Sequence, residues 1–232
     1  YLTSYHKFFE YLRDEREDNV HFWMEDETLH FEFFQGSKKV SGTATKEQLK
    51  ASAKIAQADD LNIGFMRRLM EYNFGLKYSR FALHEDNTIC IVFDTYTLDG
   101  SPYKLYYALK EMAVNADKQD DLLLDEFKSL KAVDTSHLRP LNEQEKQVKY
   151  DFIQEKIKTT LNAIDNSTLD HRQYPGANAY LLLSLTYMLD YLVKPEGYMM
   201  ETLERIHRQY FAKDKKTNFQ KQQVIYEEFK KL

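Results

Sequence analysis

The spacing of hydrophobic residues changes along this chain, and that change constrains the fold more than any other feature. Up to about residue 134, stretches with an apolar residue at every second position alternate with stretches in which apolar residues recur every three to four positions. After Pro140 only the longer spacing remains. A period of two indicates half-buried strands, whereas the longer period indicates amphipathic helices. The pattern therefore predicts an α+β domain followed by an all-helical domain.

The first part of the chain is typical of a helix followed by a small antiparallel sheet. Residues 1–17 carry apolar side chains at helical spacing, among them Tyr5 and Phe8. Strands are expected around residues 20–24 and 29–33, joined by the acidic turn "EDE". The turn "GSK" leads to a more polar third strand around residues 40–44, which we place at the edge of the sheet.

Helix signals then recur on either side of a second hairpin. Thr45 and Gln48 have the spacing of a capping box, which predicts a helix to about residue 58. The helical period resumes at residue 63 and stops at Gly75, a residue suited to a left-handed cap. A hairpin follows, with strands at 81–83 and 89–93 around the turn "HEDN". Ser101 and Pro102 then begin a third helix, which continues to Leu130 with a break near residues 117–121.

These elements give a two-layer domain in the order helix, three strands, helix, two strands, helix. We place this α+β domain at residues 1–134, with "TSHLRP" at 135–140 as the linker. The helical domain covers residues 141–232, with helices expected at 142–164, 175–193, 196–211 and 218–232.

Composition excludes several classes of function. A formal net charge of −5 argues against general electrostatic binding to nucleic acid or to anionic lipid. The most apolar segment, residues 179–193, is too short for a membrane span and contains Asp190. The single Cys90 excludes an internal disulfide framework, and no signal peptide is visible. We expect a cytoplasmic protein without a nucleic-acid or membrane partner.

The turn "HEDN" contains residue types that catalyse reactions, because imidazole and carboxylate groups act as bases or metal ligands. Neighbouring residues at a strand end point to opposite sides, however, and Asp-Asn is ordinary turn chemistry. His21 and His30 could meet across the first hairpin. A metal-dependent hydrolase or another small enzyme using His21, His30, Glu32 or His84 is therefore the rival hypothesis. The favoured interpretation has no catalytic residue, no metal and no cofactor.

Aromatic residues are unusually abundant, at 14% of the chain with 17 Tyr and 15 Phe. Such side chains fill cores, and they also supply contact area at interfaces. The sheet and the third helix carry more of them than one thin layer would require, which points to a surface covered by a second subunit, by the helical domain or by a peptide. Packing of these rings in the core is the alternative interpretation. The candidate partner-binding residues are Phe31, Phe33, Tyr103, Tyr106 and Tyr107.

The stretch "HEDNTICIVF" followed by "SPYKLYYALKEMAVNADKQDDLL" resembles the secretion chaperone-like fold of class I type III secretion chaperones and related bacterial regulators. The resemblance covers residues 1–134 and includes the order of elements. It implies a non-catalytic, acidic, usually dimeric module that holds an extended partner segment on apolar patches and strand edges. Those chaperones are generally small single domains, whereas this chain continues through residues 141–232.

Together these observations predict a non-catalytic module, chaperone-like or regulatory, that binds a protein or an extended peptide segment. A homodimer is compatible with this prediction. Besides the enzyme, a second alternative is a structural subunit whose helical domain mediates assembly.

Overall fold

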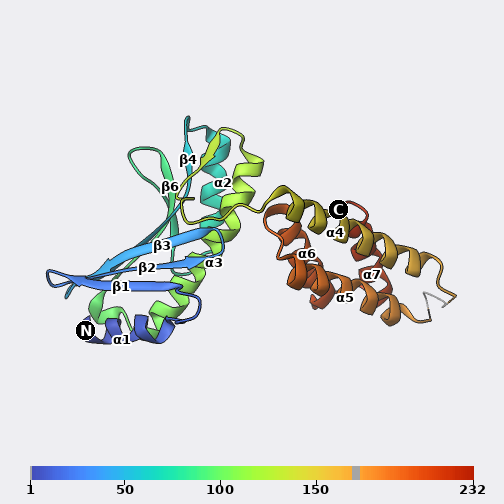
Figure 1. The fold of residues 1–232 in the computed structure, drawn as a ribbon, viewed down its shortest axis with the longest axis horizontal. Helices are drawn as coiled ribbons and strands as arrows, with labels where there is room; N and C mark the ends of the chain where they lie inside the picture. Colours follow the sequence, from blue (N-terminus) through green and yellow to red (C-terminus); the bar gives the residue numbers. More distant parts are fainter. Residues whose placement is uncertain (1, 169–172) are drawn as a thin grey trace. The chain divides into compact units, whose positions relative to one another are not determined.

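A computed structural model describes residues 2–168 and 173–232, and the chain forms two compact units. The first unit comprises residues 1–138 and the second comprises residues 139–232. The first combines helices with an antiparallel sheet, and the second is helical, as Figure 1 shows. The predicted fold class, an α+β part followed by an all-helical part, is confirmed.

The first unit is built on one antiparallel sheet of seven strands, in the order β1-β2-β3-β4-β6-β5, with β7 also paired to β4. Their bounds are Val20–Glu25 (β1), Thr28–Gln35 (β2), Lys38–Ala44 (β3), Gln48–Ala58 (β4), Arg80–Leu83 (β5), Thr88–Tyr96 (β6) and Leu130–Ala132 (β7). The strands β1 and β5 therefore lie at the two ends of this order, and each has one backbone edge outside the ladder.

Three helices cover the apolar face of this sheet: α1 (Leu2–Leu12), α2 (Ile63–Asn73) and α3 (Pro102–Glu126). A short 3-10 turn, η1 (Thr97–Asp99), precedes α3. Phe9 of α1 stacks on Phe31 of β2 with ring centroids 4.3 Å apart. Gly42 makes room for Phe31, because a Cβ there would lie 2.3 Å from the phenyl ring. The opposite face carries polar side chains, in register from His30 through Lys50 to Asp94.

Residues 48–58 form the longest strand of the sheet, so the helix predicted from Thr45 and Gln48 is wrong. The Thr45 hydroxyl does accept hydrogen bonds from the backbone N–H groups of Glu47 and Gln48, but this closes a turn between β3 and β4. Every second residue of β4 is buried, apart from an irregularity at Ile55 and Ala56, and four of the buried residues are alanine: Ala51, Ala53, Ala56 and Ala58. Alanine favours helices as an isolated residue, which masked the alternation.

Three smaller predictions are also corrected. The strand at 38–44 is not an edge, because it pairs with β2 and β4. The helix α2 ends at Phe74 in a right-handed conformation, and Gly75 has no positive φ. Finally, α3 runs to Glu126 without a break at 117–121, and Leu130 begins β7 instead of extending the helix.

A buried ion pair joins the sheet to α3. Lys38, at the start of β3, is 1% exposed and lies 3.0 Å from the carboxylate of Asp120. Its ammonium also donates to the carbonyl oxygens of Ile55 and Val133, at 3.2 and 3.3 Å. Ser37 donates its hydroxyl to Asp120 and its backbone N–H to Asp117. The turn between β2 and β3 is thereby held against the middle of α3.

Asp117 and Asp120 differ in what their charge contributes. Burial raises the pKa of Asp117, with a smaller opposing effect of the hydrogen bonds from Ser37. Its ionised form is therefore disfavoured in the folded chain. Asp120, by contrast, neutralises the ammonium of Lys38, whose side chain is almost fully buried.

We expect Asp120→Asn to lower the free energy of unfolding by about 3–5 kcal/mol, because it leaves the Lys38 ammonium buried without a counter-charge. Asp117→Asn should cost less than about 1 kcal/mol, since an amide oxygen can still accept from Ser37. Lys38→Met combined with Asp120→Asn should recover most of the loss. Urea denaturation of the variants measures these differences, and equal costs for the two single variants would contradict the assignment.

The second unit consists of α4 (Glu143–Asp165), α5 (Pro175–Val193), α6 (Gly197–Phe211) and α7 (Asn218–Phe229). Leu182, Leu185 and Leu189 of α5 form the centre of its core, and α5 packs against each of the other three helices. The predicted positions of the four helices are confirmed. Within the described residues, no helix combines the length and the apolar character needed to cross a bilayer.

Candidate functional site

The N-terminal half of α3 presents a row of exposed tyrosines. Ser101 caps the helix by accepting a hydrogen bond from the backbone N–H of Lys104, and Pro102 occupies its first position. Tyr103 is 81% exposed, Tyr106 40% and Tyr107 54%. The rings of Tyr106 and Tyr107 meet edge to face at 5.4 Å. The sequence-predicted tyrosines of α3 thus lie uncovered on the surface of the first unit.

A groove beside these tyrosines brings together two of the sequence-predicted residues. It has a volume of about 260 Å³ and lies between α3, the end of α1 and the strands β1 and β2. Tyr106 lines it from α3, and Phe33 lines it from β2. The remaining lining is mostly apolar: Leu12, Asn19, Val20, Phe34, Gln35, Leu109, Lys110, Ala113 and Val114. The groove therefore continues the tyrosine surface toward the edge of the sheet.

Phe31 lies elsewhere. It is 1% exposed and packs in the core between the sheet and α1, in contact with Phe9. Because its side chain is buried, Phe31 is not part of the exposed surface beside α3. Phe33, two residues further along β2, is half-buried and packs against the same core.

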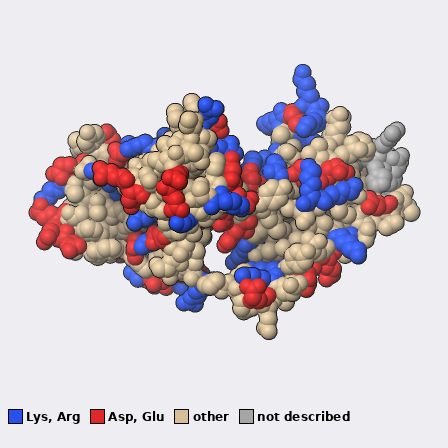
Figure 2. Space-filling view, turned by 90° about the horizontal axis from the view of Figure 1, so that it is seen from above, with Lys and Arg blue, Asp and Glu red and all other residues tan. Residues whose placement is uncertain are grey.

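The edge strand β1 borders this groove and is flanked by acidic residues. One group precedes the strand, and the other begins at its last residue: Asp14, Glu15, Glu17 and Asp18, then Glu25, Asp26 and Glu27. Figure 2 shows acidic side chains gathered at the left end of the first unit, the end at which Figure 1 draws the turn between β1 and β2. Some of these groups already have partners, such as Glu27 with Lys46 at 2.7 Å. The edge is nevertheless predominantly negative.

A carboxylate on α3 fixes the opposite end of the sheet. Glu111 accepts hydrogen bonds from the backbone N–H groups of Lys77, Tyr78 and Ser79, at 2.8–3.0 Å, and from the Ser79 hydroxyl. Desolvation raises the pKa of Glu111, but these hydrogen bonds together outweigh it and lower the pKa below its ordinary value. Glu111 thus anchors the segment that enters β5, and it keeps α3 in register with the sheet.

The residues of the rival enzyme hypothesis lie on the polar face of the sheet. His30, Glu32 and His84 line an open hollow of about 760 Å³, together with Trp23, Arg80 and Asp94. His21 does not line it. His30 stacks on Trp23 at 5.4 Å, and Arg80 pairs with Asp94 at 2.6 Å.

His21 and His30 have separate partners. His21 lies 3.3 Å from Glu32 and 3.2 Å from Asp18, and these carboxylates raise its pKa against the opposing effect of desolvation. His30 lies 3.7 Å from Glu25. Among the described residues, no group of three or more His, Cys, Asp or Glu side chains is placed to hold a metal ion.

The turn "HEDN" closes the hairpin between β5 and β6. The backbone N–H of His84 donates to the Thr88 carbonyl, and Asn87 adopts a φ of 63°. Asp86 accepts a hydrogen bond from the backbone N–H of Thr88, which lowers its pKa. Cys90, two residues further, is buried, and burial raises the pKa of its thiol. A thiol that stays protonated is a poor nucleophile.

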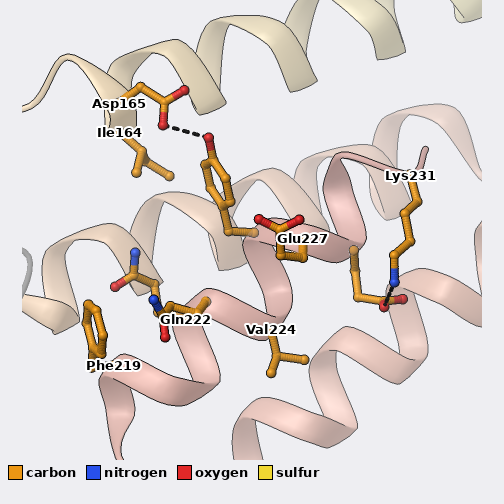
Figure 3. Close-up of a pocket in the computed structure, with 10 residues that line it drawn as sticks. Ile164, Asp165, Phe219, Gln222, Val224, Glu227 and Lys231 are labelled. Carbon is orange, nitrogen blue, oxygen red and sulfur yellow. Dashed lines mark hydrogen bonds and ion pairs between the residues drawn. The ribbon is translucent and has the colours of Figure 1, made fainter.

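The second unit has a hollow of its own, of about 890 Å³, between the end of α4 and α7. In Figure 3, Asp165 lies above it, while Phe219 and Val224 project from α7. The Tyr226 hydroxyl donates to Asp165 at 2.6 Å, and this bond raises the pKa of Tyr226 to about 12. None of the sequence-predicted site residues lies here.

Sequence reasoning missed several residues of the α3 groove, including Leu12, Phe34 and Val114. The helical period placed Leu12 in the apolar stripe of α1, but periodicity does not reveal which elements converge. A signal for Phe34 was its departure from the alternation of β2, since it follows the apolar Phe33 directly.

No family model matches the chain, and no curated protein does. Among solved structures, the chain is similar to a protein in the crystal structure of the ExsC-ExsE complex, with 17% sequence identity and a TM-score of 0.30. The match covers 46% of this chain and 77% of that chain. An identity and a TM-score this low do not establish a shared family.

Glu111→Gln tests the anchor on α3. A carboxylate with a lowered pKa stabilises the fold above its ordinary value of 4.5, and this contribution disappears as the pH falls through the folded-state pKa. The variant should therefore be less stable by about 2 kcal/mol near neutral pH, and the difference should shrink in acid. Urea denaturation between pH 7 and pH 3 measures it. Glu10→Gln, at an exposed position on α1, is the control, and a difference independent of pH would contradict the assignment.

Proposed function

We propose that the first unit is a non-catalytic module that binds an extended segment of a protein partner. The segment lies along the β1 edge and places apolar side chains in the groove between β2 and α3. The observation that supports this most directly is the uncovered tyrosine surface, Tyr103, Tyr106 and Tyr107, next to that groove. Tyrosines supply large contact areas at low conformational cost, and they are common at the centres of interfaces.

The edge of β1 provides the backbone hydrogen bonds that would hold the partner segment. An exposed edge strand offers backbone N–H and C=O groups to an added strand, while nearby pockets select side chains. Since β1 ends the strand order and borders the groove, one extended segment can use both. The acidic residues at both ends of β1 favour a segment with basic side chains. The partner class is therefore an extended, apolar and basic protein segment.

The polar hollow on the other face of the sheet supports an enzyme less well. Nucleophilic catalysis requires a nucleophile hydrogen-bonded to a base that is itself oriented by a third group. Among the described residues, no hydroxyl group that lines this hollow is hydrogen-bonded to His30 or His84. We propose that these histidines are cross-strand surface residues.

The cellular setting that we propose is the cytoplasm. A free, fully buried thiol at Cys90 is compatible with a reducing compartment. A chaperone-like role and a regulatory role use the same binding surface, and the identity of the partner decides between them.

Peptides selected from a random display library on the full chain test the proposed surface. We expect binders that are extended, apolar and basic. Simultaneous Tyr103→Ala, Tyr106→Ala and Tyr107→Ala should weaken them at least about tenfold, because buried aromatic anchors commonly contribute more than 1 kcal/mol each. Fluorescence anisotropy measures the affinity. Tyr96→Ala with Tyr150→Ala, at tyrosines that are 72% and 58% exposed, is the matched control. Equal affinity of the triple variant and the control would contradict the site.

The strand-edge contribution has its own test in the same peptides. Methylating backbone nitrogens at alternate positions should abolish binding in one register and leave it intact in the other, because only alternate N–H groups of an added strand face β1. Binding that survives both methylation patterns would show that the peptide does not extend the sheet. Affinity should also fall as salt increases, since the exposed acidic groups are screened.

We also propose that the first unit binds peptide without the second. A fragment of residues 1–138 is expected to fold and to retain the affinity of the full chain within about threefold, a difference of under 1 kcal/mol. Circular dichroism and the same anisotropy assay check this. Loss of binding in a folded fragment would favour the alternative in which the helical part of the chain is needed for assembly with the partner.

A further inference from the structure

The helix α5 is apolar on the side that its own unit leaves uncovered. Its buried side faces the core through residues such as Leu182, Leu185 and Leu189. On the outer side, six large apolar residues are 38–78% exposed: Tyr180, Leu181, Tyr187, Met188, Tyr191 and Leu192. An outer helix of a soluble bundle normally carries charged residues there. Apart from Asp190, α5 contains no charged residue.

The exposed residues form two rows along the helix. Tyr180, Tyr187 and Tyr191 make the first row, and Leu181, Met188 and Leu192 make the second. Each row repeats at i, i+7 and i+11, positions that lie within about 40° of one another at 100° per residue. Ser184 lies between the rows and keeps the middle of the stripe narrow. We call these seven residues the α5 stripe.

From this arrangement we infer that the α5 stripe is the contact between two copies of this chain, paired through antiparallel α5 helices. A two-fold axis perpendicular to such a pair sets each row against the same row of the partner copy. With the axis near residue 186, Tyr180 faces the partner's Tyr191, and Leu181 faces the partner's Leu192. The small Ser184 faces the partner's Met188. The stripe is therefore complementary to itself.

The size and the rigidity of the stripe favour a second copy over a chance exposure. Six large apolar side chains at these exposures amount to several hundred Å², about the largest apolar patch of a typical monomer. A stable interface buries roughly 800 Å² on each partner, so the stripe can form its centre. Tyr187 is already held in place, because its hydroxyl is hydrogen-bonded to Nδ1 of His207 on α6 at 2.9 Å. The stripe lies in the second unit, so this inference does not depend on the proposed peptide site.

Sedimentation equilibrium and light scattering on the full chain test the pairing. The expected mass at micromolar concentration is twice the chain mass of 27.7 kDa. Met188→Glu with Leu192→Glu should weaken dimerisation at least about a hundredfold, because four carboxylates would enter an apolar contact. The matched control is Val148→Glu with Tyr150→Glu, at positions that are 68% and 58% exposed on α4. A monomeric wild type, or a dimer unaffected by the stripe variant, would overturn the inference.

Cysteine cross-linking tests the orientation without relying on a destabilising charge. Leu181→Cys with Leu192→Cys should form disulfide-linked dimers on mild oxidation, because the two positions face each other across the pair. Either substitution alone should not, since identical positions would be about 16 Å apart along the axis, beyond the reach of a disulfide. Cross-linking of a single variant would place identical positions opposite each other, as in a parallel pair or an antiparallel pair with a shifted axis, and would overturn the proposed arrangement. A monomer that instead floats with phospholipid vesicles would assign the stripe to a lipid surface.

Discussion

The ion pair between Lys38 and Asp120 determines where α3 lies on the sheet. Removing two charges from water is costly, and the cost is recovered only if the geometry is good and the remaining donors are satisfied. Here the ammonium reaches Asp120 and two backbone carbonyl oxygens, one of them on β4 and the other just after β7. The pair therefore connects three strands to one helix. At the other end of the sheet, Glu111 holds the segment before β5.

These two anchors orient the face of α3 that matters for binding. With Asp120 and Leu109 turned to the sheet, Tyr103 and Tyr107 lie on the opposite, outer side of the helix. Tyr106 lies between the two sides and lines the groove next to β2. The position of the proposed peptide site thus follows from the packing of α3, which fixes the distance between the tyrosines and the β1 edge.

Most of the fold could be predicted from the hydrophobic period, and the failures have local causes. Strong alternation in β1, β2 and β6 marked those strands correctly, and the proline and serine at the start of α3 marked its N-terminus. The strand β4 was missed because alanine and lysine occupy its positions, and both residues favour helices in isolation. The residues of β4 form a strand because they pair with β3 on one side and β6 on the other. Propensity is overruled there by the sheet.

Individual residues of the candidate site could be predicted from the sequence, but the surface on which they meet could not. The tyrosines of α3 stood out because the sheet and this helix carry more aromatic residues than one thin layer requires. Phe31 and Phe33 have the same period in the sequence, yet Phe31 meets α1 and is buried, whereas Phe33 reaches the groove. That difference depends on which helix covers which strand, and no local pattern encodes it. The ion pair could not be predicted for the same reason. In the sequence Lys38 is part of a turn signal, and only the position of α3 over the sheet brings Asp120 to it.

Hydrogen exchange of the first unit, with and without a selected peptide, tests the central claim most directly. An added strand would pair with the free backbone groups of β1, so amides in residues 20–25 should exchange more slowly in the complex. Amides near Tyr106 should also exchange more slowly. The strand β5, at the other end of the sheet, provides the internal comparison. Protection confined to β5, or to residues that line the polar hollow, would contradict a binding site formed by β1 and α3.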